Sequence, residues 1–199
     1  MKNILAVFFC VLISACQPIV KPVNESGNLQ KQLERESILQ RRNTWSFHGR
    51  LAVSDDNQAG TVKIRWQQTG ARFDIEISLP ITGQKYRLHS VGSQVRLEGS
   101  GLAALEGDSA EAVLQQAMGW RIPFHDMQAW LRGVRADSAT AIEFGPDGLP
   151  AKFHENGWLV DYRAWDSAAT PLPMKVFANT GSDGKKASVR LQIEAWDTP

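Results

Sequence analysis

The serine, aspartate and histidine residues are the first candidates for catalysis. Ser109 in the block Gly107-Asp108-Ser109 has the surroundings of an esterase nucleophile, but the block lies mid-chain, no downstream Asp-x-x-His follows it, and a helix cap explains it better. Asp55 and Asp56 lie among turn residues and predict a turn, not an acid–base pair. The histidines show no metal-ligand spacing; they are His48, His89, His125 and His154. We therefore predict no catalytic residue, no metal site, no cofactor and no enzyme activity.

The chemistry that the sequence does indicate is lipid attachment to Cys16. Lys2, the apolar run 4–13 and the small pair Ser14-Ala15 follow the order of a secretory signal peptide, residues 1–15. The run is too short to span a bilayer, which takes about 20 residues. Leu12-Ile13-Ser14-Ala15-Cys16 resembles the bacterial lipobox, which implies a diacylglyceryl group on sulfur, cleavage before Cys16 and acylation of its amine. The alternative is an ordinary secreted protein with a chance cysteine.

Cys16 would be the only thiol of the mature chain, because Cys10 leaves with the signal. A lone cysteine excludes an intramolecular disulfide and fits lipidation. Each buried acyl CH₂ contributes about 0.8 kcal/mol, so several chains anchor firmly. Gln17 stands where an Asp would favour the inner membrane in enterobacteria, so this rule points to the outer membrane. Residues 16–27 carry two prolines and predict a tether between the lipid and a single domain, 28–199.

Length and charge further limit the classes of protein to which the chain can belong. The 199 residues fit one domain, and the hydrophobic fraction of 43% is ordinary for a globular protein. Lys and Arg number 22 against 21 Asp and Glu, and Lys2 leaves with the signal, so the mature charges balance. A neutral chain gives no electrostatic indication of nucleic-acid binding. The seven Trp predict a large core or an apolar cavity, and we expect a monomer.

The spacing of apolar residues separates helices from strands. Residues 28–42 predict a helix with Asn28 as its N-cap, its apolar Leu29, Leu33, Ile38 and Leu39 packing over one end of a sheet. From Trp45 the period becomes two, with one apolar and one polar face and short turns between segments, which is typical of an antiparallel meander. The alternating segments are 45–54, 61–70, 71–80, 84–92, 93–99, 140–145, 149–155, 157–165, 172–179 and 187–196.

Two helices interrupt this series of strands. Asp108 and Glu111 resemble a capping box before a helix that ends near Gly119. A second short helix after Pro123 ends at Gly133. A sheet of ten or eleven strands with one apolar face must curl or be covered, and these helices can cover it. We therefore predict a mainly β (α+β) fold, an antiparallel half-barrel that encloses an apolar cavity.

The residues predicted to line this cavity come from the inward positions of the strands and helices. They are Phe47, Leu51, Ile64, Trp66, Phe73, Ile75, Ile77, Leu88, Met118, Trp130, Trp158, Val160, Met174 and Leu191.

Two longer segments, 65–84 and 118–133, resemble the LolB family, the outer-membrane receptors for bacterial lipoproteins. The second follows the family pattern Gly-x-x-Ile-Pro-x-x-x-apolar-x-x-Trp-apolar-x-Gly, here from Gly119 to Gly133. The resemblance extends over nearly the whole chain and implies an eleven-stranded half-barrel capped by helices. It also implies the task of taking lipoprotein cargo from a soluble periplasmic carrier of the LolA type and releasing it into outer-membrane lipid. The domain would be lipid-anchored in the outer membrane and face the periplasm.

The resemblance also implies a membrane-insertion loop after the third strand. In the family an exposed apolar residue of this loop helps to deliver the cargo, and here that role carries over to Ile81, with Leu79 and Pro80 beside it. The usual family pattern is Pro-Leu-Gly, whereas this chain has Pro80-Ile81-Thr82-Gly83, one residue longer before the glycine. Either Ile81 is exposed, with Leu79 sharing its role, or Ile81 packs back onto the core.

Two alternatives stay open at this stage. A generic lipid-binding lipoprotein would have the cavity without an exposed apolar loop, and a scaffold lipoprotein would have a filled core. Four basic side chains on the polar face would suit an acidic carrier, but any soluble sheet alternates charges in this way. The four residues are Arg50, Lys63, Arg65 and Arg87.

Overall fold

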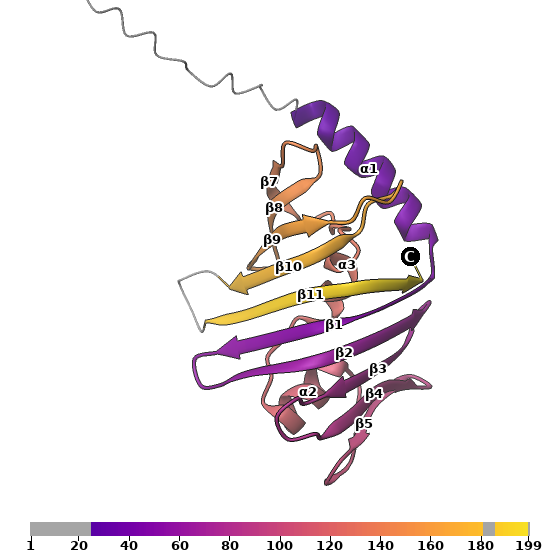
Figure 1. The fold of residues 1–199 in the computed structure, drawn as a ribbon, viewed down its shortest axis with the longest axis vertical. Helices are drawn as coiled ribbons and strands as arrows, with labels where there is room; N and C mark the ends of the chain where they lie inside the picture. Colours follow the sequence, from indigo (N-terminus) through magenta and orange to yellow (C-terminus); the bar gives the residue numbers. More distant parts are fainter. Residues whose placement is uncertain (1–24, 181–185, 199) are drawn as a thin grey trace, which may run out of the picture.

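The computed structural model describes residues 25–180 and 186–198. The predicted signal peptide, Cys16, residues 17–24 of the tether and residues 181–185 lie outside these ranges. The described chain forms one eleven-stranded antiparallel sheet and three helices (Figure 1). The strands are β1 Thr44–Asp55, β2 Ala59–Thr69, β3 Arg72–Ser78, β4 Lys85–Val91, β5 Gln94–Gly99, β6 Leu102–Gly107, β7 Thr140–Phe144, β8 Pro150–Glu155, β9 Trp158–Trp165, β10 Pro173–Thr180 and β11 Ala187–Thr198.

The sheet order confirms the predicted meander. It runs β6-β5-β4-β3-β2-β1-β11-β10-β9-β8-β7, so each half is a series of hairpins and the two halves join where β1 pairs with β11. The hairpin between β8 and β9 turns at Asn156-Gly157, whose φ angles are positive, at 50° and 80°. β6 is the strand that alternation missed, because its Leu-Ala-Ala-Leu core favours helix and its side chains are exposed or only partly buried.

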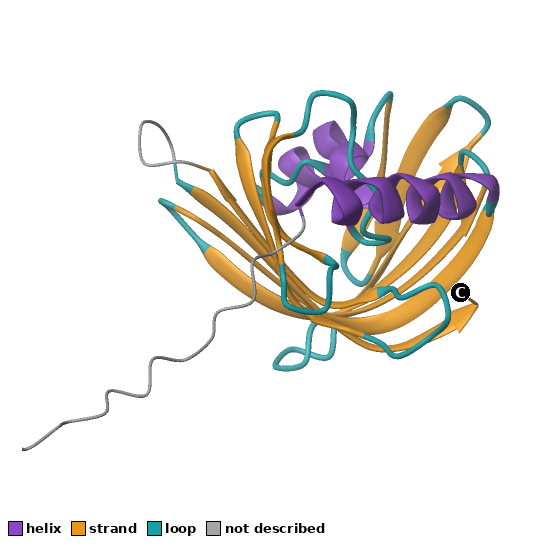
Figure 2. Ribbon diagram, turned by 90° about the horizontal axis from the view of Figure 1, so that it is seen from above, coloured by secondary structure: helices purple, strands orange, loops and turns teal. Residues whose placement is uncertain are grey.

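Figure 2 shows the sheet curved like a trough, with helices on its concave side. The long helix in this view is α1 Glu25–Arg41, and the two short ones are α2 Ala110–Met118 and α3 Phe124–Trp130. The concave side chains form one buried cluster with α2 and α3, and the ring of Phe124 stacks on Trp66 at 4.8 Å between centroids. The two inserted helices therefore cover the apolar face, as the sequence predicts. No helix in the described ranges is long and apolar enough to cross a membrane.

The cap of α2 differs from the prediction. Ser109, not Asp108, is the N-cap, and its hydroxyl accepts the Ala112 N–H at 3.1 Å. Glu111 does not complete a capping box, because its carboxylate accepts the backbone N–H of His125 at 2.7 Å. That N–H belongs to the first turn of α3, which has no side-chain cap of its own from Pro123. Glu111 thus ties the two covering helices together. Gly119 ends α2 in the left-handed conformation, as predicted.

The helix α1, Glu25–Arg41, begins three residues earlier than predicted, so Asn28 lies inside it and is not its N-cap. Its buried side chains are Gln32, Arg35, Glu36 and Leu39, whereas Leu29, Leu33 and Ile38 are exposed. The prediction of an apolar inner face was therefore wrong except at Leu39. The reason is that α1 docks on polar backbone, not on the apolar face of the sheet.

A buried polar network fastens α1 to the segment after α3. Glu36 accepts hydrogen bonds from the backbone N–H and Nε of Arg135, at 3.2 and 2.6 Å, and from Gln32 at 2.7 Å. The Arg35 guanidinium donates to the carbonyls of Arg132, Gly133 and Pro171. Burial lowers the pKa of Arg35 from its ordinary value, with Tyr162 and Glu36 acting in the opposite direction. Because these groups satisfy one another, α1 is held without a large apolar contact.

Gly49 is fixed by the close approach of two strands. It lies at a register shift between β1 and β11, where a Cβ would be 2.2 Å from the Gln192 carbonyl oxygen. We expect Gly49→Ala to lower the free energy of unfolding by about 1–3 kcal/mol, because backbone has to move. Urea unfolding would measure it. Gly60→Ala, whose nearest neighbour is the Trp120 ring at 3.4 Å, is the control with a smaller expected loss. Equal losses would contradict this explanation.

Candidate functional site

The loop between β3 and β4 projects an apolar side chain into solvent. The Gly83 N–H donates to the Leu79 carbonyl and the Leu79 N–H to the Gln84 carbonyl, both at 2.9 Å. Gly83 closes this turn with a φ of 71°. This backbone conformation is strained for other residues but not for glycine. Ile81 lies at its tip with 99% of its side chain exposed. The expectation that Ile81 is exposed is thus confirmed, and the packing of Ile81 onto the core is excluded.

The three residues named for this loop do not share one environment. Pro80 is exposed beside Ile81, whereas Leu79 is partly buried and packs against the core. The extra residue of this loop therefore lengthens the exposed tip without bringing out a second large aliphatic side chain. Exposed apolar residues are common singly, but an isoleucine with almost no protein contact contributes nothing to folding. Its side chain is free to enter an apolar phase.

The residues predicted to line a cavity lie in the interior. Of the fourteen, Met118, Trp158 and Met174 are partly buried and the others are buried. They belong to one buried cluster that includes side chains of α2 and α3, and within it Trp66 stacks on Phe124. The inward direction of these positions is confirmed. In this structure they fill the interior as the hydrophobic core, which is the arrangement expected of the scaffold alternative, so their role as the lining of an acyl-chain cavity stays a prediction.

The β3–β4 loop and an open pocket lie at the same edge of the sheet. β1 and β3 are both antiparallel to β2, and β1 and β10 are both antiparallel to β11, so the C-terminal ends of β1, β3 and β10 lie at the same edge. We call this edge the loop rim. Beside it lies a pocket of about 390 Å³, the rim pocket. It is lined by Asp55, Asp56, Asn57, Glu111, Gln115, Trp120, Arg121, Ile122, Pro123, Trp158, Thr180, Lys186 and Ala187.

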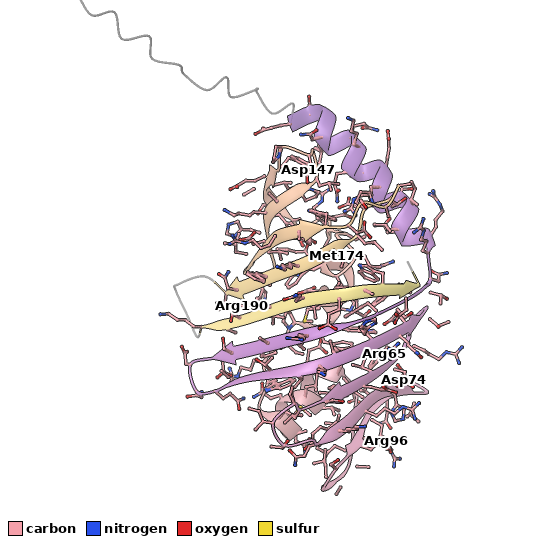
Figure 3. All side chains as sticks on the ribbon, in the orientation of Figure 1. Arg65, Asp74, Arg96, Asp147, Met174 and Arg190 are labelled. Atoms are coloured by element: carbon pink, nitrogen blue, oxygen red, sulfur yellow. The ribbon has the colours of Figure 1, made fainter. Side chains whose placement is uncertain are left out.

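The convex face of the sheet carries paired charges. Arg65, Asp74 and Arg96, from β2, β3 and β5, lie on the face opposite α2 and α3 (Figure 3). Arg65 pairs with Asp197 at 2.9 Å, Arg87 with Asp74, and Arg96 with Glu98 and Glu106. The hydrogen bond from Arg87, above all, lowers the pKa of Asp74. Such pairs neutralise this face, which speaks against the basic surface considered from the sequence.

His48 and the turn aspartate Asp55 make structural hydrogen bonds. His48 contacts Asp197 at 3.1 Å, and the Asp55 carboxylate accepts the N–H groups of Asn57 and Gln58, which makes the predicted turn. Within residues 25–180 and 186–198, no group of three or more His, Cys, Asp or Glu side chains is placed to hold a metal ion.

An open antiparallel sheet, curved over two short helices and carrying an exposed isoleucine at its rim, defines a half-barrel protein with a large apolar interior. The fold is similar to that of a solved LolA superfamily protein from Nitrosomonas europaea, with a TM-score of 0.53 at 11% identity, covering 85% of this chain and 93% of that one. The family described as "Outer membrane lipoprotein LolB" matches residues 43–196. The chain belongs to the LolB family.

Named relatives support this assignment. The outer-membrane lipoprotein LolB of Xanthomonas oryzae pv. oryzae (strain MAFF 311018) is 35% identical over 185 residues, which cover 89% of this chain and 83% of the relative. That of Xanthomonas campestris pv. campestris (strain B100) is 35% identical over 189 residues, covering 92% and 84%. The family resemblance and the half-barrel of eleven strands predicted from the sequence are both confirmed.

Sequence reasoning missed the rim pocket and the buried network of α1. The residues of the pocket come from strands and turns and from the segment 111–123, which are far apart in the sequence, and both strand pairing and the packing of α2 on the sheet bring them together. The network left a signal, since Gln32, Arg35 and Glu36 recur at helical spacing on one face. The prediction placed the apolar residues Leu29, Leu33, Ile38 and Leu39 on the inner face instead.

Proposed function

We propose that this protein is a lipid-anchored receptor of the outer membrane, which accepts lipoproteins from a LolA-type periplasmic carrier and inserts them into the membrane. The observation that carries the proposal is Ile81, 99% exposed at the tip of its loop in a chain that belongs to the LolB family. A membrane-inserting loop needs an apolar side chain that folding does not use. The lipid anchor is Cys16, which lies outside the described residues.

The apolar interior supplies the second part of the proposal. Acyl chains in water are unfavourable by about 0.8 kcal/mol per CH₂, so transfer has to pass from one apolar interior to another. The core between the sheet and the helices α2 and α3 is the site where chains would be held, which requires these helices to move away from the sheet. Net direction needs tighter binding than in the carrier, and about 1.4 kcal/mol gives a tenfold preference.

A transfer assay tests the proposed function. The unlipidated domain, with Cys16 replaced, is mixed with a LolA-type carrier that holds a labelled lipoprotein, without nucleotide. The label should move to the domain, because binding preference alone drives the exchange. If the label stays on the carrier while the domain binds free lipid, the alternative of a generic lipid-binding lipoprotein is favoured.

The anchor gives a separate prediction. We expect Cys16→Ala to abolish lipid attachment in cells and to move the protein from the membrane pellet to the soluble fraction, because the acyl chains supply most of the membrane affinity. Fractionation and mass spectrometry of the mature N-terminus would measure this. The neighbouring change Ser14→Ala keeps a small residue before the cysteine and should leave anchoring intact. Unchanged membrane association of Cys16→Ala would refute the anchor.

A further inference from the structure

The rim pocket combines an apolar floor with a charged mouth. Its volume of about 390 Å³ is that of a small-ligand site. Trp120, Ile122 and Pro123 from the linker between α2 and α3 form the floor, together with Trp158 at the start of β9. The charged residues around it are Asp55, Asp56, Glu111, Arg121 and Lys186.

The floor of the rim pocket is continuous with the core. Trp120 is buried and lies over Gly60, where an added Cβ would be 3.4 Å from its ring. Trp158 is only partly buried, and its ring lies 6.1 Å from that of the fully buried Trp130. A ligand in the rim pocket would thus contact the outermost side chains of the same apolar cluster that is proposed to hold acyl chains.

The mouth of the pocket offers two cations to a polar group. Arg121 and Lys186 are exposed, and neither side chain has a salt-bridge partner among residues 25–180 and 186–198. The carboxylates, in contrast, are engaged: Asp55 and Glu111 cap backbone N–H groups, and Asp56 accepts the Lys186 N–H at 3.1 Å. Arg121 and Lys186 are therefore the side chains at the mouth whose N–H groups are available as donors, which suit ester and peptide carbonyl oxygens.

A molecule that fits this arrangement has an apolar end and a carbonyl-rich head. Tryptophan suits such a boundary, because its ring is apolar and its N–H is polar. The pocket has the size for one part of a triacylated molecule, not for all its chains. It also lies at the loop rim, the same edge from which Ile81 projects.

Building on the proposed function, we infer that the rim pocket binds the junction between the acyl chains and the peptide of a lipoprotein cargo. The first methylenes lie on Trp120 and Trp158, and the glyceryl esters and first peptide carbonyls accept hydrogen bonds from Arg121 and Lys186. A cargo held in this way has its acyl chains in the core and its peptide outside. It leaves at the rim that carries the membrane-inserting loop.

Site-specific photo-crosslinking tests this inference. A benzoylphenylalanine replaces either Gln115, which lines the rim pocket, or its exposed neighbour Gln116, which does not. The unlipidated domain is then incubated with a synthetic tripalmitoyl-cysteinyl lipopeptide, illuminated and analysed by mass spectrometry. Both sites are exposed positions of α2, so both variants should fold.

We expect crosslinking at position 115 to exceed that at position 116 at least about tenfold, with the adduct on the glyceryl group or the first peptide residues. Equal yields, or an adduct at the distal end of an acyl chain, would overturn the inference while leaving the proposed function intact. Binding of the lipopeptide to the unmodified domain is measured in parallel. If that domain does not bind the lipopeptide at all, both the inference and the proposed function are wrong.

Discussion

Replacing Ile81 with Glu should leave cargo acceptance unchanged and reduce membrane insertion at least about tenfold. The side chain is 99% exposed, so its replacement removes no packing and should not alter stability. Burying an isoleucine in an apolar phase contributes about 1.5–3 kcal/mol, and a carboxylate adds a cost instead. The loss therefore falls on the step in which the loop enters lipid. Transfer from carrier to domain and from domain to liposomes are measured separately.

Val91 offers the matched control for this experiment. It is an exposed apolar residue, 45% accessible, at the end of β4 and so at the edge of the sheet opposite the loop rim. Val91→Glu adds the same charge and should not affect insertion, and Ile81→Leu should retain it. If Ile81→Glu inserts cargo at the normal rate, or Val91→Glu fails equally, the assigned role of the loop is wrong.

The second large effect is expected on stability, at Glu36. Its carboxylate is 7% exposed and pairs with Arg135, which is 8% exposed. Glu36→Ala leaves the buried guanidinium and the Arg135 N–H without their acceptor, and removing one partner of a buried pair costs about 3–5 kcal/mol. We expect the free energy of unfolding to fall by that amount in urea titrations. The helix α1 should also become accessible to proteases before the sheet does.

Glu34 is the control on the same helix. It is exposed, and the structure shows a hydrogen bond from Gln30 to its carboxylate. Glu34→Ala removes the same charge from α1 and should change stability by less than about 0.5 kcal/mol. A similar small change for Glu36→Ala would mean that α1 does not depend on its polar network.

The structure agrees best with the predictions from the sequence where a single local pattern decides the conformation. Alternation of apolar residues from Trp45 to Trp196 determined ten of the eleven strands and the inward direction of the core residues, because side chains of a strand alternate between its faces. The exposure of Ile81 was one of two open possibilities. It was decided by the Leu79–Gln84 and Gly83–Leu79 hydrogen bonds, which hold the tip of the loop away from the core.

By itself, then, the sequence determined the lipid-anchor motif, the antiparallel meander with its two covering helices and the family. Tertiary structure decided the features that depend on contacts between segments far apart in the sequence. The buried face of α1 is polar because the carbonyls of Arg132, Gly133 and Pro171 meet it. Glu111 accepts a backbone N–H of the first turn of α3 instead of capping its own helix, α2, because Pro123 gives α3 no side-chain cap. The rim pocket exists because strand ends, α2 and the linker after it meet at one edge of the sheet, and no periodicity within a single segment predicts that contact.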